Sequence, residues 1–141
     1  APRRAHRGQF DCLLATIEVE PGGLSLRVHN ASRELRLRAE GQRDADMWLC
    51  ALLTAAGACR ALPTDTAAET ALLLAVGGDP ISLRSFYRFL RQEGGGADSL
   101  LLFWLQARLL KQIASISSWP SAAVNTASRA LVAHHAAALP A

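Results

Sequence analysis

Few residues of this sequence have the types and spacing that chemistry requires. His134 and His135 are adjacent, so on a helix their side chains would point about 100° apart and could not bind one metal ion together. The glycine run at 94–96 lacks the lysine that a phosphate-binding loop needs. The cysteines are three in number and form no C-x-x-C pair, which argues against both a disulfide framework and a zinc site. We therefore expect surface histidines, no catalytic residue, no metal and no cofactor.

Composition limits the classes of protein to consider. A chain of 141 residues corresponds to about one domain, or to two incomplete ones. Half of the residues are hydrophobic, but no apolar run approaches the roughly 18 residues of a membrane span. The unpaired cysteines favour a reducing compartment, so we expect a cytoplasmic protein, and peripheral attachment to a membrane stays open as an alternative. No aromatic pattern typical of RNA-binding domains is present, and we expect no nucleic-acid partner.

The first part of the chain changes its hydrophobic period near residue 40. Upstream, apolar and polar residues alternate as in half-buried strands, and three antiparallel strands are predicted over 10–20, 24–29 and 33–39, separated by turn sequences. Downstream, the period becomes helical over 44–56: Trp48, Ala51, Leu52 and Ala55 fall at i, i+3, i+4 and i+7. Because the apolar face of the sheet needs a cover, we expect this helix to lie on the sheet with Trp48 facing it.

Residues 8–58 resemble the C-terminal half of a pleckstrin-homology domain. The last strand of that family ends in a pattern similar to Leu37 and Ala39 here and leads to a helix with one tryptophan, which corresponds to Trp48. The resemblance implies that Trp48 is a core residue. It also implies docking to a membrane phosphoinositide or to a protein, although the lipid-binding residues of the family lie mainly in strands that would precede residue 1. Arg3, Arg4 and Arg7 are either a remnant of that segment or a solvated basic tail.

The second part is predicted to be helical throughout. Residues 59–65 form a linker, in which Thr64 or Asp65 can cap a helix that continues to residue 76. Asp79 and Pro80 have the residue types of an N-cap and a first helical position. Further helices follow over about 81–93, from Asp98 or Ser99 to residue 111, and over 121–139, with Arg108 and Lys111 complementing the C-terminal end of the middle one.

Residues 66–141 resemble the regulator of G-protein signalling family, which also occurs as a homology domain in receptor kinases, sorting nexins and kinase-anchoring proteins. The pattern F-x-x-F-L-x-x-E, a short loop and L-x-F-W-L carry the resemblance, and the matching residues are Phe86, Phe89, Leu90, Glu93, Phe103, Trp104 and Leu105. The aromatic members and Leu90 are expected in the core, as in the family. Such a role establishes a fold and no activity.

The resemblance implies contact with a heterotrimeric G-protein α subunit (Gα). Members of the family accelerate GTP hydrolysis by holding the Gα switch segments in their transition-state arrangement, through acidic residues and an asparagine near this loop. Here the contact residues would be Glu93, Asp98 and Ser99. Leu100 stands where the asparagine is expected, and the glycine run makes the loop costly to order. Two functions stay open: a regulator with GTPase-activating capacity, and a scaffold that binds a signalling protein without accelerating hydrolysis.

These observations predict an α+β chain in two parts. Residues 1–58 would form three antiparallel strands and a capping helix, and residues 66–141 would form a segment of a helical bundle, joined by the linker at 59–65. Both ends have the character of cuts through domains. The chain is expected to be no enzyme in its own right, and at most a GTPase activator.

Overall fold

The chain has an α+β fold with one three-stranded sheet and five helices in the part that the structure describes. A computed structural model describes residues 10–30, 32–76, 79–115 and 121–138. Arg3, Arg4, Arg7 and the side chain of His134 lie outside this description. The elements are β1 (Thr16–Val19), β2 (Ser25–His29), β3 (Glu34–Arg38), α1 (Gln42–Ala56), α2 (Ala67–Val76), α3 (Pro80–Glu93), α4 (Ala97–Ala114) and α5 (Ser121–Ala138). The predicted order of strands and helices is confirmed.

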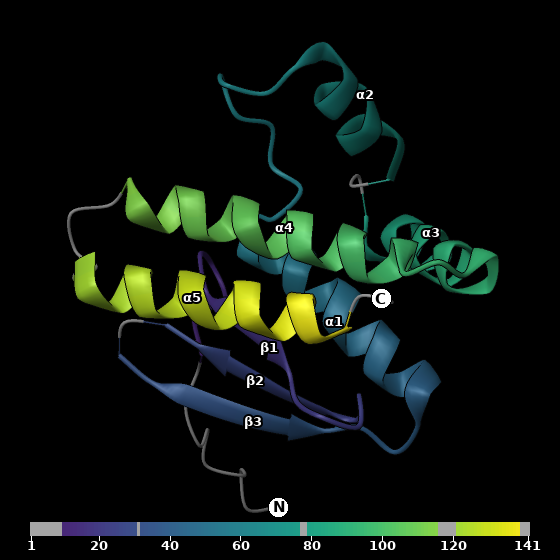
Figure 1. Cartoon of the computed structure of the whole chain (residues 1–141), viewed down its shortest axis with the longest axis horizontal. Coiled ribbons are helices and arrows are strands. Elements are labelled where there is room, and N and C mark those ends of the chain that lie inside the picture. Colours follow the sequence, from purple (N-terminus) through teal and green to yellow (C-terminus); the bar gives the residue numbers. More distant parts are fainter. Residues whose placement is uncertain (1–9, 31, 77–78, 116–120, 139–141) are drawn as a thin grey trace, which may run out of the picture.

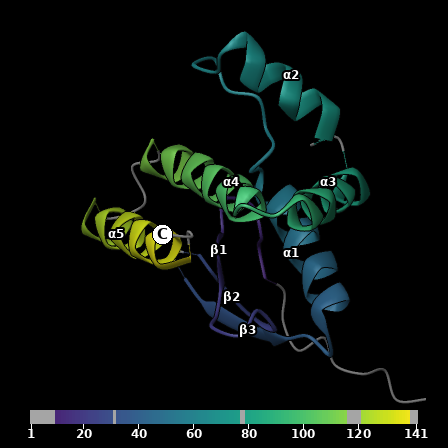
Figure 2. The same cartoon turned by 45° about the vertical axis from the view of Figure 1, so that its right-hand side comes forward.

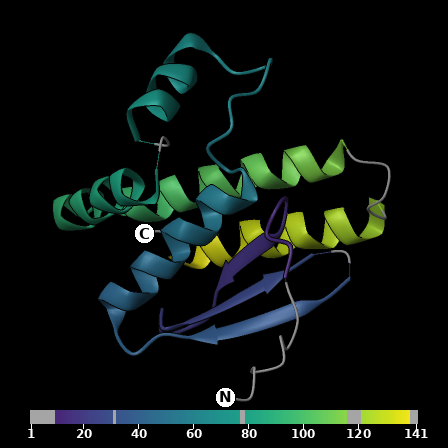
Figure 3. The same cartoon turned by 180° about the vertical axis from the view of Figure 1, so that it is seen from behind.

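The sheet is antiparallel in the order β1-β2-β3, with Ile17 paired to Val28 and Glu18 to Arg27. Alternation of side chains gives it two different faces. Ile17, Leu26 and Val28 are buried on the face toward α1, whereas Glu18, Arg27 and their neighbours make the other face polar. Figures 1 and 2 show α5 beside α4 and on the opposite side of the sheet from α1. Seen from behind, α1 runs diagonally beside the strands (Figure 3).

Helix α1 covers the sheet, but it does so with a different face from the predicted one. The side chain of Trp48 is 44% exposed, so its predicted role as a core residue facing the sheet is wrong. Leu49 and Leu53 are buried in its place. More than half of the circumference of this helix is apolar, and the face that packs is the one that also brings Asp46 into contact with α3. The pleckstrin-type interpretation loses its main support.

The helix ends follow local capping chemistry. Thr66 and Glu69 exchange hydrogen bonds between side chain and main-chain N–H at the start of α2, which is a capping box. The prediction that Thr64 or Asp65 caps this helix is therefore wrong. At α3, Asp79 accepts a hydrogen bond from the Ser82 N–H with Pro80 at the first position, as predicted. The predicted side-chain cap of α4 is wrong, because its N-cap is Gly96, which has no side chain.

Buried side chains from both parts of the chain form one continuous core. The cluster extends from Ala15 to Leu109 and includes Leu53 of α1, Leu83 of α3 and Leu105 of α4. The sequence is expected to form two domains, but in this structure the sheet and the helical part share their buried surface. Helix α2 stands away from the sheet and contacts α3 (Figure 1).

Candidate functional site

The predicted protein-contact residues lie together at the hairpin between α3 and α4. Glu93, the last residue of α3, is exposed, and Asp98 and Ser99, in the first turn of α4, are half-buried. Leu100 follows them with a 52% exposed side chain. The connection at 94–96 has positive φ at all three glycines, a conformation that residues with a side chain rarely adopt. The glycine run is therefore a requirement of this tight connection.

Ion pairs fix the base of this hairpin against α1. Both Asp46 carboxylate oxygens accept hydrogen bonds from the Arg91 guanidinium, at 2.6 and 2.9 Å, and the Asp46 side chain is 3% exposed. The Nε of Arg91 also lies 3.7 Å from Asp98, and its guanidinium stands over the Tyr87 ring. The hydrogen bond to Asp46 is the main cause of a raised Arg91 pKa, so this arginine stays charged. One arginine thus ties α1 to both arms of the hairpin.

The side chains of α3 predicted to be core, together with Trp104 of α4, divide into two groups. Phe86, Leu90 and Trp104 are half-buried and pack against the core cluster. Phe89 is 52% exposed, so its prediction as a core residue is wrong. Phe89 lies six residues from the buried Leu83, about 240° around a helix, and therefore cannot share its face. With its ring 6.4 Å from Phe86, it extends an apolar surface along α3.

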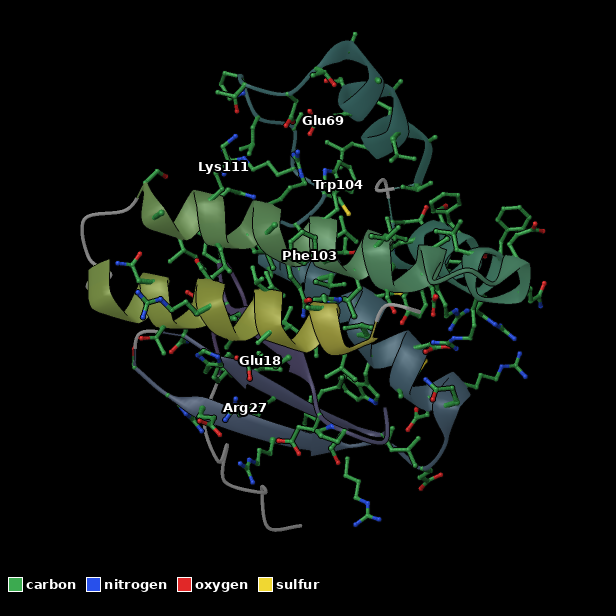
Figure 4. The ribbon with its side chains drawn as sticks, viewed as in Figure 1. Glu18, Arg27, Glu69, Phe103, Trp104 and Lys111 are labelled. Carbon is green, nitrogen blue, oxygen red and sulfur yellow. The ribbon has the colours of Figure 1, made fainter. Side chains whose placement is uncertain are left out.

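Phe103 packs against α5 through a histidine. Its ring makes an edge contact with His135, at 5.3 Å between centroids, between α4 and α5 (Figure 4). The prediction that His135 lies at the surface is wrong, since it is 4% exposed and lies 2.8 Å, nitrogen to oxygen, from the Gln106 side chain. The adjacent position of two histidines excluded a shared metal but gave no information on burial.

A buried arginine, Arg108, holds the expected linker. Arg108 pairs with Asp65 at 2.5 and 2.9 Å and donates hydrogen bonds to the carbonyls of Ala58 and Arg60. Its guanidinium also stands over the Trp104 ring, 5.1 Å from the centroid. The hydrogen bonds that Asp65 accepts from Arg108, and then the one from the Leu62 N–H, lower the pKa of Asp65 to about 2. Residues 59–65 are thus bound to α4 through Arg108. The positive charge of Arg108 pairs with Asp65, and not with the C-terminal end of its own helix as predicted.

A cavity of about 360 Å³ lies between β1 and helices α4 and α5. Glu18 and Arg27 are on the sheet side, below α5 in Figure 4. Arg27 donates to Glu18 through Nε at 3.0 Å and through Nη2, and His29 Nε2 lies 3.3 Å from the same carboxylate. Hydrogen bonding to His29, then to Arg27, lowers the Glu18 pKa to about 2. Glu18 therefore remains ionised at all ordinary pH values.

Within the described part of the chain, no group of three or more His, Cys, Asp or Glu side chains is placed to hold a metal ion. Among the described helices, none combines the length and apolar character of a membrane span. Comparison of the chain with protein-family models, curated proteins and solved structures gives no match. Function must therefore be argued from the surface and the cavity of this chain.

Sequence reasoning missed the polar groups inside the fold. Asp46 and Arg91 are 45 residues apart and Asp65 and Arg108 are 43 apart, so no local period connects them. A weak signal exists for the first pair, because Asp46 falls between apolar residues of α1, where a charge requires a partner. The cavity has no signal in the sequence, since residues of four separate elements, β1, β2, α4 and α5, line it.

Proposed function

We propose that the chain is a non-enzymatic docking module of intracellular signalling, and that the α3–α4 hairpin binds a Gα subunit. The observation that carries the proposal is the character of the hairpin tip, where the acidic Glu93 and the apolar Leu100 are both exposed. Protein contact surfaces combine an apolar centre with a polar rim, and Leu100 and Glu93 provide one group of each kind. The resemblance of 66–141 to the regulator of G-protein signalling family supports Gα as the partner.

The base of the hairpin supports a preformed contact surface. Arg91 connects Asp46 in α1 with Asp98 at the start of α4, so the two arms are held before a partner arrives. A preorganised surface loses less conformational entropy on binding than a mobile loop does.

Binding without GTPase acceleration is the form of the proposal that the side chains favour. Leu100 stands where the related family has an asparagine, and a hydrocarbon side chain cannot donate or accept a hydrogen bond in the transition state. Ser99 is half-buried beside it and has a shorter reach. The hairpin would then bind the ground state of Gα with GTP as tightly as the transition state of hydrolysis. Equal binding of the two states does not raise the rate of GTP hydrolysis.

Biolayer interferometry with the full chain tests the contact. Gα is presented with GDP, with GDP and aluminium fluoride, and with a non-hydrolysable GTP analogue, and binding is expected to at least one form. Glu93→Arg and Leu100→Asp should each weaken it at least tenfold. Glu40→Arg, which makes the same charge change at an exposed residue between β3 and α1, should not.

Single-turnover GTP hydrolysis separates the two signalling functions. The rate should be the same with and without the protein, at concentrations that saturate the binding measured above. A rate increase that Glu93→Arg abolishes would establish a regulator with GTPase-activating capacity instead. Absence of binding to every nucleotide form would reject Gα as the partner.

A further inference from the structure

Strand β3 has an open edge along its outer side. It is the last strand in the order β1-β2-β3 and lies at the border of the sheet (Figure 3). The Ala39 N–H donates to the Leu24 carbonyl, and hydrogen-bonded pairs recur at every second residue along two antiparallel strands. Leu35 and Leu37 therefore direct their main-chain groups toward β2. The main-chain groups of residues 34, 36 and 38 point outward, where they can pair with another strand.

The sequence of β3 is complementary to itself in the antiparallel orientation. The strand reads Glu34-Leu35-Arg36-Leu37-Arg38. When two copies of it run antiparallel about a two-fold axis at Arg36, Glu34 lies opposite Arg38 of the second copy, and Leu35 lies opposite Leu37. Side chains directly opposite each other on neighbouring strands interact, and the two-fold axis makes each of these pairs occur twice. In the same register, the outward N–H and C=O groups of the two strands meet.

The charges of β3 are available for this pairing. Charged residues on an edge strand commonly prevent pairing with another chain, but here opposite charges meet at both ends of the register. Arg38 is exposed and makes no ion pair within the part of the chain that the structure describes. Arg36 would face its own copy at the axis. Its Nε lies 3.4 Å from Glu34 and 3.6 Å from Glu20, so acidic groups of its own chain offset its charge there.

The apolar face of β3 gains cover from the same pairing. Leu35 and Leu37 are half-buried, and they lie on the face of the buried residues Leu26 and Val28, with which they pair across β2. Helix α1 packs on this face over β1 and β2. A second copy would place its own Leu37 and Leu35 beside the two leucines and remove apolar surface from water, which favours association.

We propose that two copies of the chain associate through antiparallel pairing of β3 with β3, about a two-fold axis at Arg36, so that their sheets become one continuous sheet. The contact is small, and interfaces below about 1,200 Å² belong mainly to weak or transient complexes, so the dimer forms reversibly at micromolar concentrations. The edge of β3 is separate from the α3–α4 hairpin. The proposal therefore goes beyond binding to Gα and does not depend on it.

Sedimentation velocity and amide hydrogen exchange test the pairing on the full chain. Between about 5 and 500 µM, the range of a weak complex, the sedimentation coefficient should rise from that of a monomer to that of a dimer. Over the same range, the amides of residues 34, 36 and 38 should become protected from exchange. The amides of Leu35 and Leu37, which are bonded to β2, should be protected at every concentration. A monomer throughout, or a dimer that leaves residues 34, 36 and 38 unprotected, would overturn the proposal.

Charge reversal at the two ends of β3 tests the register. Glu34→Arg and Arg38→Glu each place like charges opposite each other twice, and each should weaken self-association about tenfold or more. Arg88→Glu makes the same charge change as Arg38→Glu at an exposed position of α3 and should have no effect. Circular dichroism of each variant establishes that the fold is retained.

Mixing the two reversed variants supplies the decisive result. Glu34→Arg has arginine at both ends of β3 and Arg38→Glu has glutamate at both ends, so opposite charges meet again only when one copy of each associates. With a fluorescent label on one variant, the mixture should sediment as a 1:1 dimer of about the affinity of the unaltered protein. Pairing about Leu35 instead would put Glu34 opposite Arg36 and leave Arg38→Glu without effect. That result, or a mixture that stays monomeric, would refute the assignment.

Discussion

Replacing Asp46 by alanine tests the ion pair that joins α1 to the α3–α4 hairpin. The carboxylate is 3% exposed and accepts two hydrogen bonds from Arg91 and one from Gln42, the last at 3.0 Å. Removing one partner of a buried pair costs about 3–5 kcal/mol, because the other charge is left without compensation. Arg91 is 35% exposed and keeps Asp98 nearby, so the loss should lie at the lower end, about 3 kcal/mol.

Urea unfolding followed by circular dichroism measures this loss. With a denaturant slope of about 2 kcal/mol/M, the midpoint of Asp46→Ala should fall by about 1.5 M. Glu34→Ala is the control, since its pair with Arg36 is exposed and exposed pairs contribute less than about 1 kcal/mol. The double variant Asp46→Leu with Arg91→Met removes both charges and should recover most of the lost stability. If Asp46→Ala shifts the midpoint no more than Glu34→Ala does, the argument that this pair holds the hairpin is refuted.

Three further outcomes are expected. The folded-state pKa of Glu18, about 2, is below its ordinary value of 4.5, so its stabilising contribution is present above pH 4.5 and is lost as pH falls toward 2. Glu18→Gln should therefore reduce the dependence of the unfolding free energy on pH between these two values. The same pH dependence in Glu18→Gln and in the unaltered protein would contradict this. Leu105→Ala, at a 1% exposed position, should lower the free energy of unfolding in urea by about 2–5 kcal/mol. Trp48→Ala, at a 44% exposed position, should lower it by only about 1 kcal/mol. A larger loss for Trp48→Ala than for Leu105→Ala would show that Trp48 is a core residue. Gly94→Ala should destabilise by about 1–3 kcal/mol because φ 77° and ψ −165° are accessible almost only to glycine. Gly41→Ala, at the extended N-cap of α1 with open space around it, should cost only about 0.5–1 kcal/mol, the difference between glycine and alanine as N-caps. Equal thermal midpoints of the two variants would show that the loop adopts another conformation.

Local chemistry explains why the elements were predictable. The alternation around Leu35 and Leu37 depends on neighbours within one strand, and β3 appears where it predicts. Asp79 followed by Pro80 begins α3 as expected, because a cap needs only residues within one turn. The order of the three strands was predictable for a similar reason, because short turns allow only strands that are consecutive in the sequence to pair.

The buried faces of the helices were less predictable. In α1, the predicted stripe through Trp48 competes with one through Leu49 and Leu53, and both have helical spacing. Hydrophobic period alone cannot choose between them, because the choice depends on what the sheet and α3 present. Asp46 decides it: a face that included Trp48 would turn this carboxylate away from Arg91, its partner on α3.

Helix α4 shows most clearly why polar residues mislead a sequence interpretation. Its buried Gln106, Arg108 and Gln112 interrupt the apolar pattern, and in an isolated helix they would mark the solvent side. Each instead donates to main-chain carbonyls of another segment: Gln106 to Ile17 at the sheet edge, Arg108 to Ala58 before the linker and Arg60 within it, and Gln112 to Gly57 at the end of α1. These carbonyls lie where regular hydrogen bonding stops, and leaving them buried and unpaired would be costly. The helix therefore supplies both the apolar contacts of the core and the hydrogen-bond donors for strand edge, helix end and linker, and only the assembled fold can identify a polar residue with that role.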